Sequence, residues 1–556
     1  MISFIQRAKR LIVHCWLLLR PMALFFLFGL LLLVFAAGRQ PVSAQTDTPV
    51  VPATTALEAT AAAYTVYLSM VSAAPAQPTP TPAPTSAPTS VPTPAPTLAP
   101  TPVPTPVPTS TPSSPISFTD PAYGAAAVVG EVLEPCTTEG TVLAPTDDWE
   151  TSIADASPGA TLLLRGGVYQ ATDKLKLPSG APEQWITLKP YNCEAVTLYT
   201  SIRPGSYNII AGLHIEAVGI ADITWSIRVD GKNGAPIRQV IIRNNTILGG
   251  EKDALKVSAD VANLTITGNH IDGGKISHVL NVQADETTTL PDQIIITNNL
   301  LTKSHFKIPS EDMIQITEAR HVEFSHNTCA NGYMMEQCVD IKETQAPVIV
   351  TNNLFDGSTL HLGGDGVDGS KGCMVIHEHD GHAENHQIVQ NMFRNCQDTI
   401  IRFASEGGNA ISSGTLRYNV FISPSATDAD GLLIWRAVDV LFENNTMIRG
   451  TLKLGKNGEA DKIPQNTVLK NNLFYQSRID DRTQAPATTY QCSHDLFFQT
   501  SGNLDRAMCQ NSLWDLDPLL ANIANEDLHP ASNSPACTGG ENSVAQGAIP
   551  CRAAVD

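Results

Sequence analysis

The apolar positions of this chain fall in short runs that return with a regular period. Each run holds Ile, Val, Leu or Phe, is closed by Asn, and is followed by another apolar residue. Gly and Asn interrupt the runs too often for helices, and the composition is typical of strands bounded by turns. A strand repeat of this length predicts a solenoid. The closing Asn residues define a column with spacings of 24 to 38 residues: Asn245, Asn269, Asn299, Asn327, Asn353, Asn391, Asn419, Asn445 and Asn472.

A solenoid explains the column because one such strand cannot bury its apolar side alone, whereas stacked coils cover one another. An Asn at the same place in every coil suits a left-handed turn conformation. Its amide can also bond to the Asn residues above and below it, as in stacked amide ladders. The alternative, surface turns of an ordinary β-sandwich, requires nine copies at a near-constant period to arise by chance.

The repeats resemble the right-handed parallel β-helix superfamily over roughly residues 145–480. The phrase SPGATLLLRGGVYQ at 157–170 is similar to the entry segment of many secreted members, and DLDPLLANIANEDLHPASNSPAC at 515–537 is similar to their terminal segment. The resemblance implies an all-β fold, a right-handed parallel β-helix solenoid with an asparagine ladder over residues 116–480. It also implies a C-terminal, disulfide-containing cap over residues 481–556.

Two segments before residue 116 carry no repeat. Residues 1–44 contain a basic start, an apolar run and a small-residue cleavage pattern, which predict a secretory signal peptide. An uncleaved membrane anchor is the alternative, since the apolar run is near the minimum spanning length. Residues 45–115 form a Pro/Thr-rich linker, which we expect to be disordered or extended. We therefore expect a secreted or cell-surface protein that meets a membrane only through its N-terminal segment.

Charge adds a constraint on partners. The net charge is −19, from 35 basic and 54 acidic residues. The first 44 residues hold five of the basic residues and no acidic ones, so the remainder carries 30 − 54, or −24. A strongly acidic body argues against nucleic acid as a partner. Nothing in the sequence calls for an oligomer, and we expect a monomer.

The cysteine count predicts disulfides. Of 11 cysteines, Cys15 lies in the predicted signal peptide, and ten remain in a chain predicted to be exported. No CxxC motif occurs, which disfavours a zinc site. Proximity in sequence suggests four pairs and leaves a fifth: Cys329–Cys338, Cys373–Cys396, Cys492–Cys509, Cys537–Cys551 and Cys136–Cys193.

A second strand precedes each Asn phrase. Side chains alternate along a strand, so one apolar residue of each can be placed inward: Leu255, Leu280, Ile314, Ile341, Ile376, Ile401, Ile434 and Leu452. The residue that follows each of these then points outward: Lys256, Asn281, Gln315, Lys342, His377, Arg402, Trp435 and Lys453. This arrangement predicts one file of polar and mostly cationic groups, spaced about 4.8 Å per coil. Such a file on an acidic body fits an extended acidic polysaccharide, at close to one sugar per coil.

The resemblance implies a reaction as well, because many members of the superfamily are polysaccharide lyases that work by β-elimination. This chemistry needs a base, for which Lys342 or Lys256 can serve, and a cation on the substrate carboxylate. We expect Arg402 and His377 to act on the substrate at the catalytic site. The polar file supplies the substrate-binding residues Gln315, Asn281, Trp435 and Lys453. Acidic residues near the strand starts are candidate ligands for Ca²⁺: Asp253, Glu311, Asp312 and Asp340.

The nearest enzyme resemblance is to polysaccharide lyase family nine, in fold and residue types. The RxPxxR and WxDH phrases of other lyases are absent, as is the polygalacturonase set of aspartates. The HEHDGH phrase at 377–382 is read as a polar loop, with a transition-metal site as the alternative. We therefore expect an exported β-helix protein acting on acidic polysaccharide, a calcium-dependent lyase in one reading. The alternatives are a non-catalytic glycan-binding or adhesin-like protein and a glycoside hydrolase, for which Asp312 and Asp340 are the carboxylate pair to test.

Overall fold

The computed structural model describes Tyr123 and most of residues 135–553. The predicted signal peptide and the whole Pro/Thr-rich linker (residues 45–115) lie outside the described residues. In the described part of the chain no helix has the length and apolar character needed to span a membrane. The gaps within 135–553 are residues 218–224, 232–234, 251, 274–276, 285–288, 304–311, 333–336, 358–371, 379–381, 397–398, 406–410, 424–430, 457–462 and 484–488.

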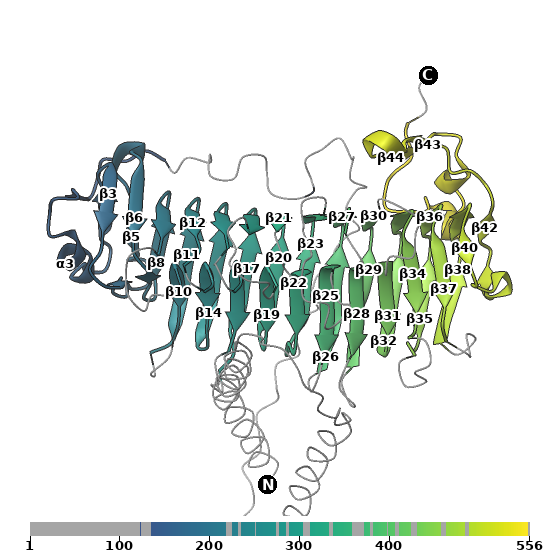
Figure 1. Ribbon diagram of the computed structural model, residues 1–556, viewed down its shortest axis with the longest axis horizontal. Coiled ribbons are helices and arrows are strands. Elements are labelled where there is room, and N and C mark those ends of the chain that lie inside the picture. Colours follow the sequence, from purple (N-terminus) through teal and green to yellow (C-terminus); the bar gives the residue numbers. More distant parts are fainter. Residues whose placement is uncertain are drawn as a thin grey trace, which may run out of the picture. The chain divides into compact units, whose positions relative to one another are not determined.

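The described strands form three long parallel sheets, which we call sheets A, B and C (Figure 1). The chain passes through A, then B, then C, and returns to A one coil further on. Each strand therefore pairs with the equivalent strands of the coils before and after it. In sheet A, for example, Val240 is opposite Asn208 on one side and Leu264 on the other. The expected parallel β-helix is confirmed.

The strand bounds follow the order of the coils. The described strands of sheet A are β1 (Thr141–Leu143), β2 (Thr161–Leu164), β5 (Ile186–Pro190), β8 (Asn208–Ala211), β11 (Ile237–Arg243), β14 (Val261–Thr267), β17 (Asp292–Thr297), β20 (Arg320–Ser325), β23 (Val348–Thr351), β26 (His382–Val389), β29 (Ile411–Arg417), β32 (Ala437–Glu443), β35 (Thr467–Lys470), β38 (Tyr490–Ser493) and β41 (Cys509–Gln510). Those of sheet B are β3 (Gly167–Gln170), β6 (Val196–Tyr199), β9 (His214–Glu216), β12 (Thr246–Leu248), β15 (His270–Asp272), β18 (Leu300–Lys303), β21 (Thr328–Gly332), β24 (Leu354–Asp356), β27 (Met392–Arg394), β30 (Val420–Ile422), β33 (Thr446–Ile448), β36 (Leu473–Tyr475), β39 (Leu496–Phe498) and β42 (Leu513–Trp514). Those of sheet C are β4 (Leu175–Lys176), β7 (Ile202–Arg203), β10 (Ile227–Val229), β13 (Leu255–Val257), β16 (Leu280–Gln283), β19 (Ile314–Thr317), β22 (Gln337–Lys342), β25 (Gly372–Glu378), β28 (Thr399–Ser405), β31 (Gly431–Trp435), β34 (Thr451–Leu454), β37 (Arg478–Asp481) and β40 (Ser501–Gly502).

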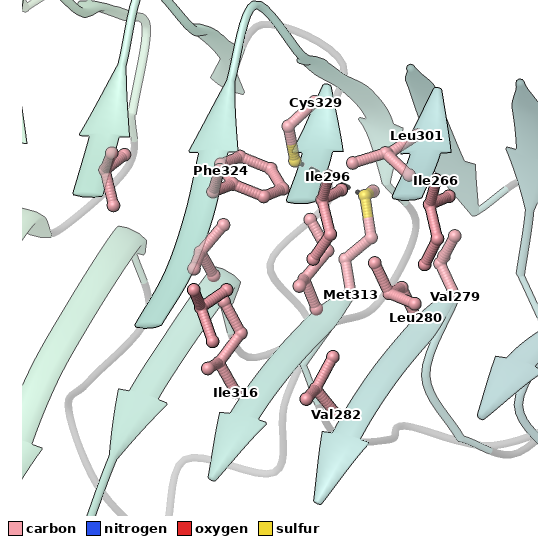
Figure 2. Close-up of a cluster of buried hydrophobic side chains, with 14 of the residues drawn as sticks. Ile266, Val279, Leu280, Val282, Ile296, Leu301, Met313, Ile316, Phe324 and Cys329 are labelled. Carbon is pink, nitrogen blue, oxygen red and sulfur yellow. Dashed lines mark hydrogen bonds between the residues drawn. The ribbon is translucent and has the colours of Figure 1, made fainter. Parts of the chain in front are cut away.

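One apolar core fills the space between the three sheets. Figure 2 shows a section of it, in which Ile266 and Ile296 of sheet A lie beside Leu280 of sheet C and Leu301 of sheet B. All four side chains are fully buried. Removing one such Leu or Ile side chain costs about 2–5 kcal/mol in a packed core, so each coil holds its neighbours in register. All eight residues that we expected to point inward from sheet C are fully buried.

The column of asparagines forms the expected ladder at the turn from sheet A to sheet B. Asn269 shows the repeated geometry: its Nδ2 donates to Asn299 Oδ1 at 3.0 Å and to the Ile242 carbonyl at 2.9 Å. The backbone N–H of Asn269 also donates to Asn299 Oδ1. The same bonds recur from Asn245 to Asn472, and these side chains are completely buried.

The ladder residues themselves are not the ones in the left-handed conformation. The residue before each ladder position has the positive φ, as at Asn244 (φ 54°), Gly268 (φ 66°) and His326 (φ 53°). Placing the left-handed residue one position earlier turns the ladder amide inward, where it meets the amides of the adjoining coils. Our expectation about which Asn adopts this conformation is therefore wrong by one residue.

Aromatic rings line one edge of the core in the C-terminal coils. Phe355, Phe393 and Phe421 are aligned in sheet B, with ring centroids 4.6 and 5.3 Å apart. Met447 takes the next place in sheet B, and there the stack continues through Phe442 of sheet A. Stacked Phe pairs at these distances stabilise by about 0.5–1.5 kcal/mol beyond burial.

Five disulfides join the ten cysteines after the predicted signal peptide. They are the pairs that sequence proximity suggested: Cys136–Cys193, Cys329–Cys338, Cys373–Cys396, Cys492–Cys509 and Cys537–Cys551. Cys492 and Cys509 face each other on neighbouring strands of sheet A, whereas the last pair lies in the terminal segment.

Short elements cover the ends of the solenoid. Helix α3 (Trp149–Ala154) begins after Asp148, whose side chain accepts from the Thr151 N–H, and it buries Trp149 and Ile153. Strands of all three sheets continue past residue 480, where we expected the cap to begin, as far as Trp514. The remaining segment contains the antiparallel pair β43 (Leu520–Asn522) and β44 (Asp527–Pro530). The 3₁₀ turns are η1 (Tyr191–Cys193), η3 (Arg506–Met508), η4 (Ile523–Asn525), η5 (Pro535–Cys537) and η6 (Glu541–Ser543).

The terminal segment packs against the outer face of sheet B. Leu528 and Ile549 are buried against Val420 and Ile448 of that sheet. The Ala548 N–H donates to Thr446 Oγ1 at 2.9 Å. This arrangement leaves sheet C as the face whose outward residues differ most in chemistry from coil to coil.

Candidate functional site

The outward side chains of sheet C form two columns. The register gives a first column of Lys256, Asn281, Gln315, Asp340, Val375, Arg402, Leu433 and Lys453. It gives a second column, two residues further along each strand, of Gln283, Thr317, Lys342, His377, Ala404 and Trp435. The single file that we expected is therefore wrong. Each strand has two inward apolar positions, and Ile341, Ile376 and Ile434 occupy the second.

The two columns are also largely covered. Lys256, Trp435 and Lys453 are only 5%, 5% and 4% exposed, and Asn281, Gln315 and His377 are buried as well. Apolar Val375 and Leu433 interrupt the first column. The expected continuous, exposed cationic groove is not present in the described residues. The register of the sheet C strands instead brings polar side chains together in two separate clusters.

The first cluster, which we call the Asp340 cluster, consists of Asp340, Lys342 and His377. Asp340 lies within β22 and points outward, whereas we expected it at the start of the strand. Lys342 Nζ is 3.1 Å from Asp340 Oδ2, and His377 Nε2 is 2.9 Å from Asp340 Oδ1. Lys342 and His377 face each other on adjacent strands of the second column. One carboxylate thus holds two basic groups from neighbouring coils.

Electrostatics keep Asp340 ionised. Burial alone raises the pKa of this carboxyl group. The hydrogen bond and charge of His377, together with the Lys342 ammonium, outweigh burial and hold the pKa below its usual range. A buried anion of this kind orients its partners and favours their protonated forms. The Lys342 side chain is 27% exposed, so the cluster reaches the surface through its ammonium group.

The remaining predicted residues lie further along the sheet. Arg402 is half-buried and lies two coils beyond Asp340 in the first column. The Trp435 ring is packed beneath Lys456, whose Nζ lies 4.5 Å from the ring centroid. Lys453 is opposite Asp480, which itself binds Arg478 at 2.7 Å. Neither Trp435 nor Lys453 belongs to the Asp340 cluster.

The second cluster surrounds a cavity of about 370 Å³ three coils earlier, which we call the Asp253 pocket. Its lining residues are Trp225, Lys252, Asp253, Lys256, Ser277, His278, Asn281, Gln283 and Gln315. Asp253 Oδ1 is 3.0 Å from His278 Nδ1 and accepts from the His278 N–H at 3.0 Å. Its other oxygen accepts from Trp225 Nε1 at 3.1 Å. Lys256 Nζ donates to Gln283 Oε1 at 3.2 Å.

Asp253 is ionised for the same reason as Asp340. Burial raises its pKa, but the hydrogen bond and charge of His278, with Ser277 and Lys256, lower it to about 2. The carboxylate is satisfied by the imidazole and by the Trp225 indole. It therefore positions these two groups rather than presenting a free anion.

The expected calcium ligands do not converge. No group of three or more acidic, His or Cys side chains suited to a metal occurs among the described residues. Asp253 and Asp340 are each held by basic groups, and they lie three coils apart. Asp312, just before β19, is buried two coils beyond Asp253, and Glu311 lies outside the described residues. These carboxylates do not fit a shared Ca²⁺ site, which needs six to eight oxygen ligands.

Five residues of the pocket were missed from the sequence: Trp225, Lys252, Ser277, His278 and Gln283. The spacing of residues in the sequence does indicate the position of His278. It lies two residues before the inward Leu280, as Asp253 lies two residues before the inward Leu255. Because these leucines are opposite each other, the two polar residues had to meet on adjacent coils.

Comparison with known proteins yields structural likeness only. No protein-family model and no curated protein matches the sequence. A PL6 family alginate lyase, AlyGC, is 13% identical, with a TM-score of 0.41 over 67% of this chain and 50% of that one. Alginate lyase AlyF-OU02, in complex with G6, is 11% identical, with a TM-score of 0.47 over 76% and 98%. Pectate lyase Pel9A is 11% identical, with a TM-score of 0.33 over 75% and 98%.

This chain spans only half of the AlyGC chain. At these identities and scores the likeness concerns the fold, and no residue role is transferred from these proteins.

Proposed function

We propose that this protein binds an acidic polysaccharide on sheet C and cleaves it by β-elimination at the Asp340 cluster. The observation that carries the proposal is the pair of basic groups, Lys342 and His377, held on one buried carboxylate. Such a cluster combines a cation for a substrate carboxylate with a group able to take a proton. Both functions are needed where a proton α to a uronate carboxylate is removed.

The elimination can be written on these residues. A base takes the proton from the carbon next to the uronate carboxylate. The electron pair forms a carbon–carbon double bond, and the bond to the glycosidic oxygen on the adjacent carbon breaks. That oxygen leaves with a proton from an acid or from water. The negative charge that develops on the carboxylate needs a cation close by.

We take His377 as the base, acting in its neutral form; both of its ring nitrogens are buried, so substrate reaches the imidazole only once it is uncovered. A histidine bound to a buried carboxylate is held in one orientation, and the imidazolium that forms is stabilised by the anion. Lys342 faces the same carboxylate, which favours its charged ammonium form. We therefore assign Lys342 to the substrate carboxylate and His377 to the proton. This reverses the roles that the sequence suggested, and Arg402 is a further cation for the chain of sugars.

Calcium enters the proposal only as a condition to be tested, because the described carboxylates do not fit a shared site. Export remains part of the proposal and is supported by the five disulfides, which are typical of oxidising compartments.

The test is an assay of the full chain on pectate, alginate and chondroitin, each with and without calcium. Ultraviolet absorbance of unsaturated uronate reports elimination. We expect absorbance to rise on at least one polymer. His377→Gln should lower kcat by about 10²–10⁴-fold, and Lys342→Met by about 10²–10³-fold. Lys189→Met, at a partly exposed lysine on β5 of sheet A, is the matched control and should keep full activity.

Other outcomes identify the alternatives. No absorbance on any uronate polymer would overturn the lyase. New reducing ends without absorbance would indicate a glycoside hydrolase. Polymer binding without either product would indicate a glycan-binding protein. Activity that survives both His377→Gln and Lys342→Met would place the chemistry elsewhere.

A further inference from the structure

The Asp253 pocket has features of a built binding site rather than of a gap between coils. It is a partly open recess of about 370 Å³ over the outward side chains of sheet C. Polar side chains from three coils line it: Asp253 and Lys256, then His278 and Asn281, then Gln315. Ordinary protein interiors do not collect so many polar groups around one space without a partner for them.

Two of these polar groups lack partners in the described protein. Asn281 is 4% exposed, and its Oδ1 is buried with no hydrogen-bond partner, while its Nδ2 is 3.1 Å from His278 Nδ1. His278 Nδ1 already faces the ionised Asp253. Turning the Asn281 amide over would place Oδ1 toward that imidazole and expose Nδ2 instead. In either orientation one amide atom of Asn281 is left buried and unsatisfied at the cavity wall, which costs about 1–3 kcal/mol.

Gln315 closes the same wall in the next coil. It is 7% exposed, lines the cavity, and makes no side-chain hydrogen bond to the described residues, so its amide faces the cavity. A buried, unsatisfied amide atom of Asn281 and the Gln315 amide that faces the same cavity from the next strand point to a ligand with several hydrogen-bonding groups.

The charged side chains that line the pocket indicate the charge of the ligand. Lys252 and Lys256 contribute two cations, whereas Asp253 is engaged by His278 and Trp225. One face of the Trp225 ring is covered by Arg228, whose guanidinium lies 4.3 Å from the ring centroid. The other face is the one on which a ligand ring can stack. Cations, amides and one aromatic face together suit a hydroxylated ring that carries a carboxylate.

We propose that the Asp253 pocket is a distal sugar subsite that holds one uronate residue of the polysaccharide. Lys256 binds the carboxylate of this uronate, and Asn281 and Gln315 bind its hydroxyl groups. Asp253 holds the His278 and Trp225 side chains in place, and these two form one wall of the pocket. The proposal deepens the proposed function and rests on it for the identity of the polymer.

The register places this subsite relative to the Asp340 cluster. Lys256, Asn281, Gln315 and Asp340 are consecutive in the first column, so three coils separate the two sites. At about 4.8 Å per coil this is about 14 Å. A chain with close to one sugar per coil would then be held about three sugars from the bond that is cleaved. The subsite would set the minimum substrate length and the size of the product.

The test measures binding and cleavage separately, with the full chain. Binding is followed by calorimetry with tetrasaccharides of galacturonate, guluronate and mannuronate, and with cellotetraose as the neutral counterpart. We expect at least one uronate tetrasaccharide to bind and cellotetraose not to bind. Lys256→Met and Asn281→Asp should weaken uronate binding at least ten-fold. Lys189→Met, on sheet A, should stay within two-fold of the unsubstituted protein.

Cleavage supplies the second measurement. For the unsubstituted protein, kcat/KM should rise steeply once the oligosaccharide is long enough to reach from the Asp340 cluster to the pocket. Lys256→Met should abolish this rise and leave the shortest cleaved substrate unaffected. Gln283→Leu, which removes the partner of Lys256, replaces Lys256→Met if thermal unfolding shows that the latter does not fold.

The two proposals fail differently. Uronate binding that depends on Lys256 and Asn281 without any cleavage would leave the subsite standing and overturn the lyase. Cleavage that depends on His377 but is indifferent to Lys256 and Asn281 at every substrate length would overturn the subsite. Tight binding of cellotetraose at the pocket would overturn the assignment to a uronate.

Discussion

The ladder turn and sheet C both carry a polar residue in coil after coil, yet they differ in how those residues are satisfied. At the ladder turn nine successive coils contribute the same amide, and each of these amides bonds to the side chain of the next coil. On sheet C the first column runs through a lysine, two amides, an aspartate, a valine and an arginine. Lys256 and Asp340 pair in local clusters, whereas Asn281 Oδ1 has no partner in the described part of the chain.

This difference separates scaffold from site. A buried polar group that is fully paired stabilises one register and leaves nothing for a ligand. A buried polar group without a partner costs stability, so its presence in a folded protein calls for another explanation. The ladder is therefore expected to control stability without touching function. The outward residues of sheet C are expected to control ligand binding and to contribute little to stability.

The largest expected effect is on the ladder. Asn353 accepts from the N–H and Nδ2 of Asn327, and donates to Phe324 O at 2.8 Å and Asn391 Oδ1 at 2.9 Å. Asn353→Ala leaves several of these buried groups unsatisfied. We expect the free energy of unfolding to fall by about 3–5 kcal/mol, because each orphaned group costs about 1–3 kcal/mol. Denaturant unfolding followed by circular dichroism measures the loss.

Ile349 supplies the control in the same coil. It lies four residues before Asn353 on sheet A and is 43% exposed. Ile349→Ala should change stability by no more than about 0.5 kcal/mol. Glycan binding per folded molecule should be unchanged in both variants. A small loss for Asn353→Ala, equal to that of Ile349→Ala, would contradict a structural role for the ladder.

The ladder ends in a carboxyl group. Asp495 Oδ1 accepts from Asn472 N at 2.7 Å and Asn472 Nδ2 at 2.8 Å, and the side chain is fully buried. Burial raises the pKa of Asp495 to about 7, although the bonds from Asn472 act in the opposite direction. The unfolded chain loses this proton near pH 4, whereas the native protein keeps it until about pH 7. Stability from this site is therefore full below about pH 4 and is lost as pH rises to about 7.

Asp495→Asn completes the ladder and removes the titration. The new amide oxygen can accept the same two bonds from Asn472, and no charge is buried. We expect the variant to be more stable than the unsubstituted protein by about 2–4 kcal/mol at pH 8, since three pKa units correspond to about 4 kcal/mol. At pH 4 the difference should nearly vanish. Unfolding curves at the two pH values test the sign, and a gain that is the same at both would refute the titration of Asp495.

The sequence predicted the structure correctly where the same structural constraint recurs at regular spacing along the chain. The solenoid, the ladder and the disulfides each depend on spacing along the chain, and spacing can be read directly. Even the last ladder position was readable: SHDLFF at 493–498 has the form of SHNTC at 325–329, with Asp in place of Asn. A column defined by Asn alone does not include this aspartate.

The candidate site was harder because it depends on register. Each sheet C strand offers two inward apolar positions two residues apart, and the hydrophobic pattern treats them as equivalent. Choosing Ile341 as the equivalent of Leu255 placed Lys342 in line with Lys256, whereas the structure aligns Asp340 there. The loops between strands differ in length, so only the paired strands reveal which polar groups meet.

The smallest expected effect on stability, and the sharpest contrast with the ladder, is at Gln315. Its amide makes no hydrogen bond to the described residues and faces the pocket, so Gln315→Leu removes no hydrogen bond within the described protein and replaces the amide with a side chain of similar size. We expect the free energy of unfolding to stay the same or to rise by up to about 1 kcal/mol. Uronate binding should weaken several-fold, because two hydrogen-bonding atoms leave the pocket. Gln546 is also buried; its Oε1 has no partner among the described residues, but its Nε2 donates to the His494 and Gly539 carbonyls, so Gln546→Leu should instead lose about 1–3 kcal/mol and bind normally. If Gln315→Leu were as destabilising as Gln546→Leu, Gln315 would belong with the ladder, as scaffold, and the polar wall of the pocket would need no ligand to explain it.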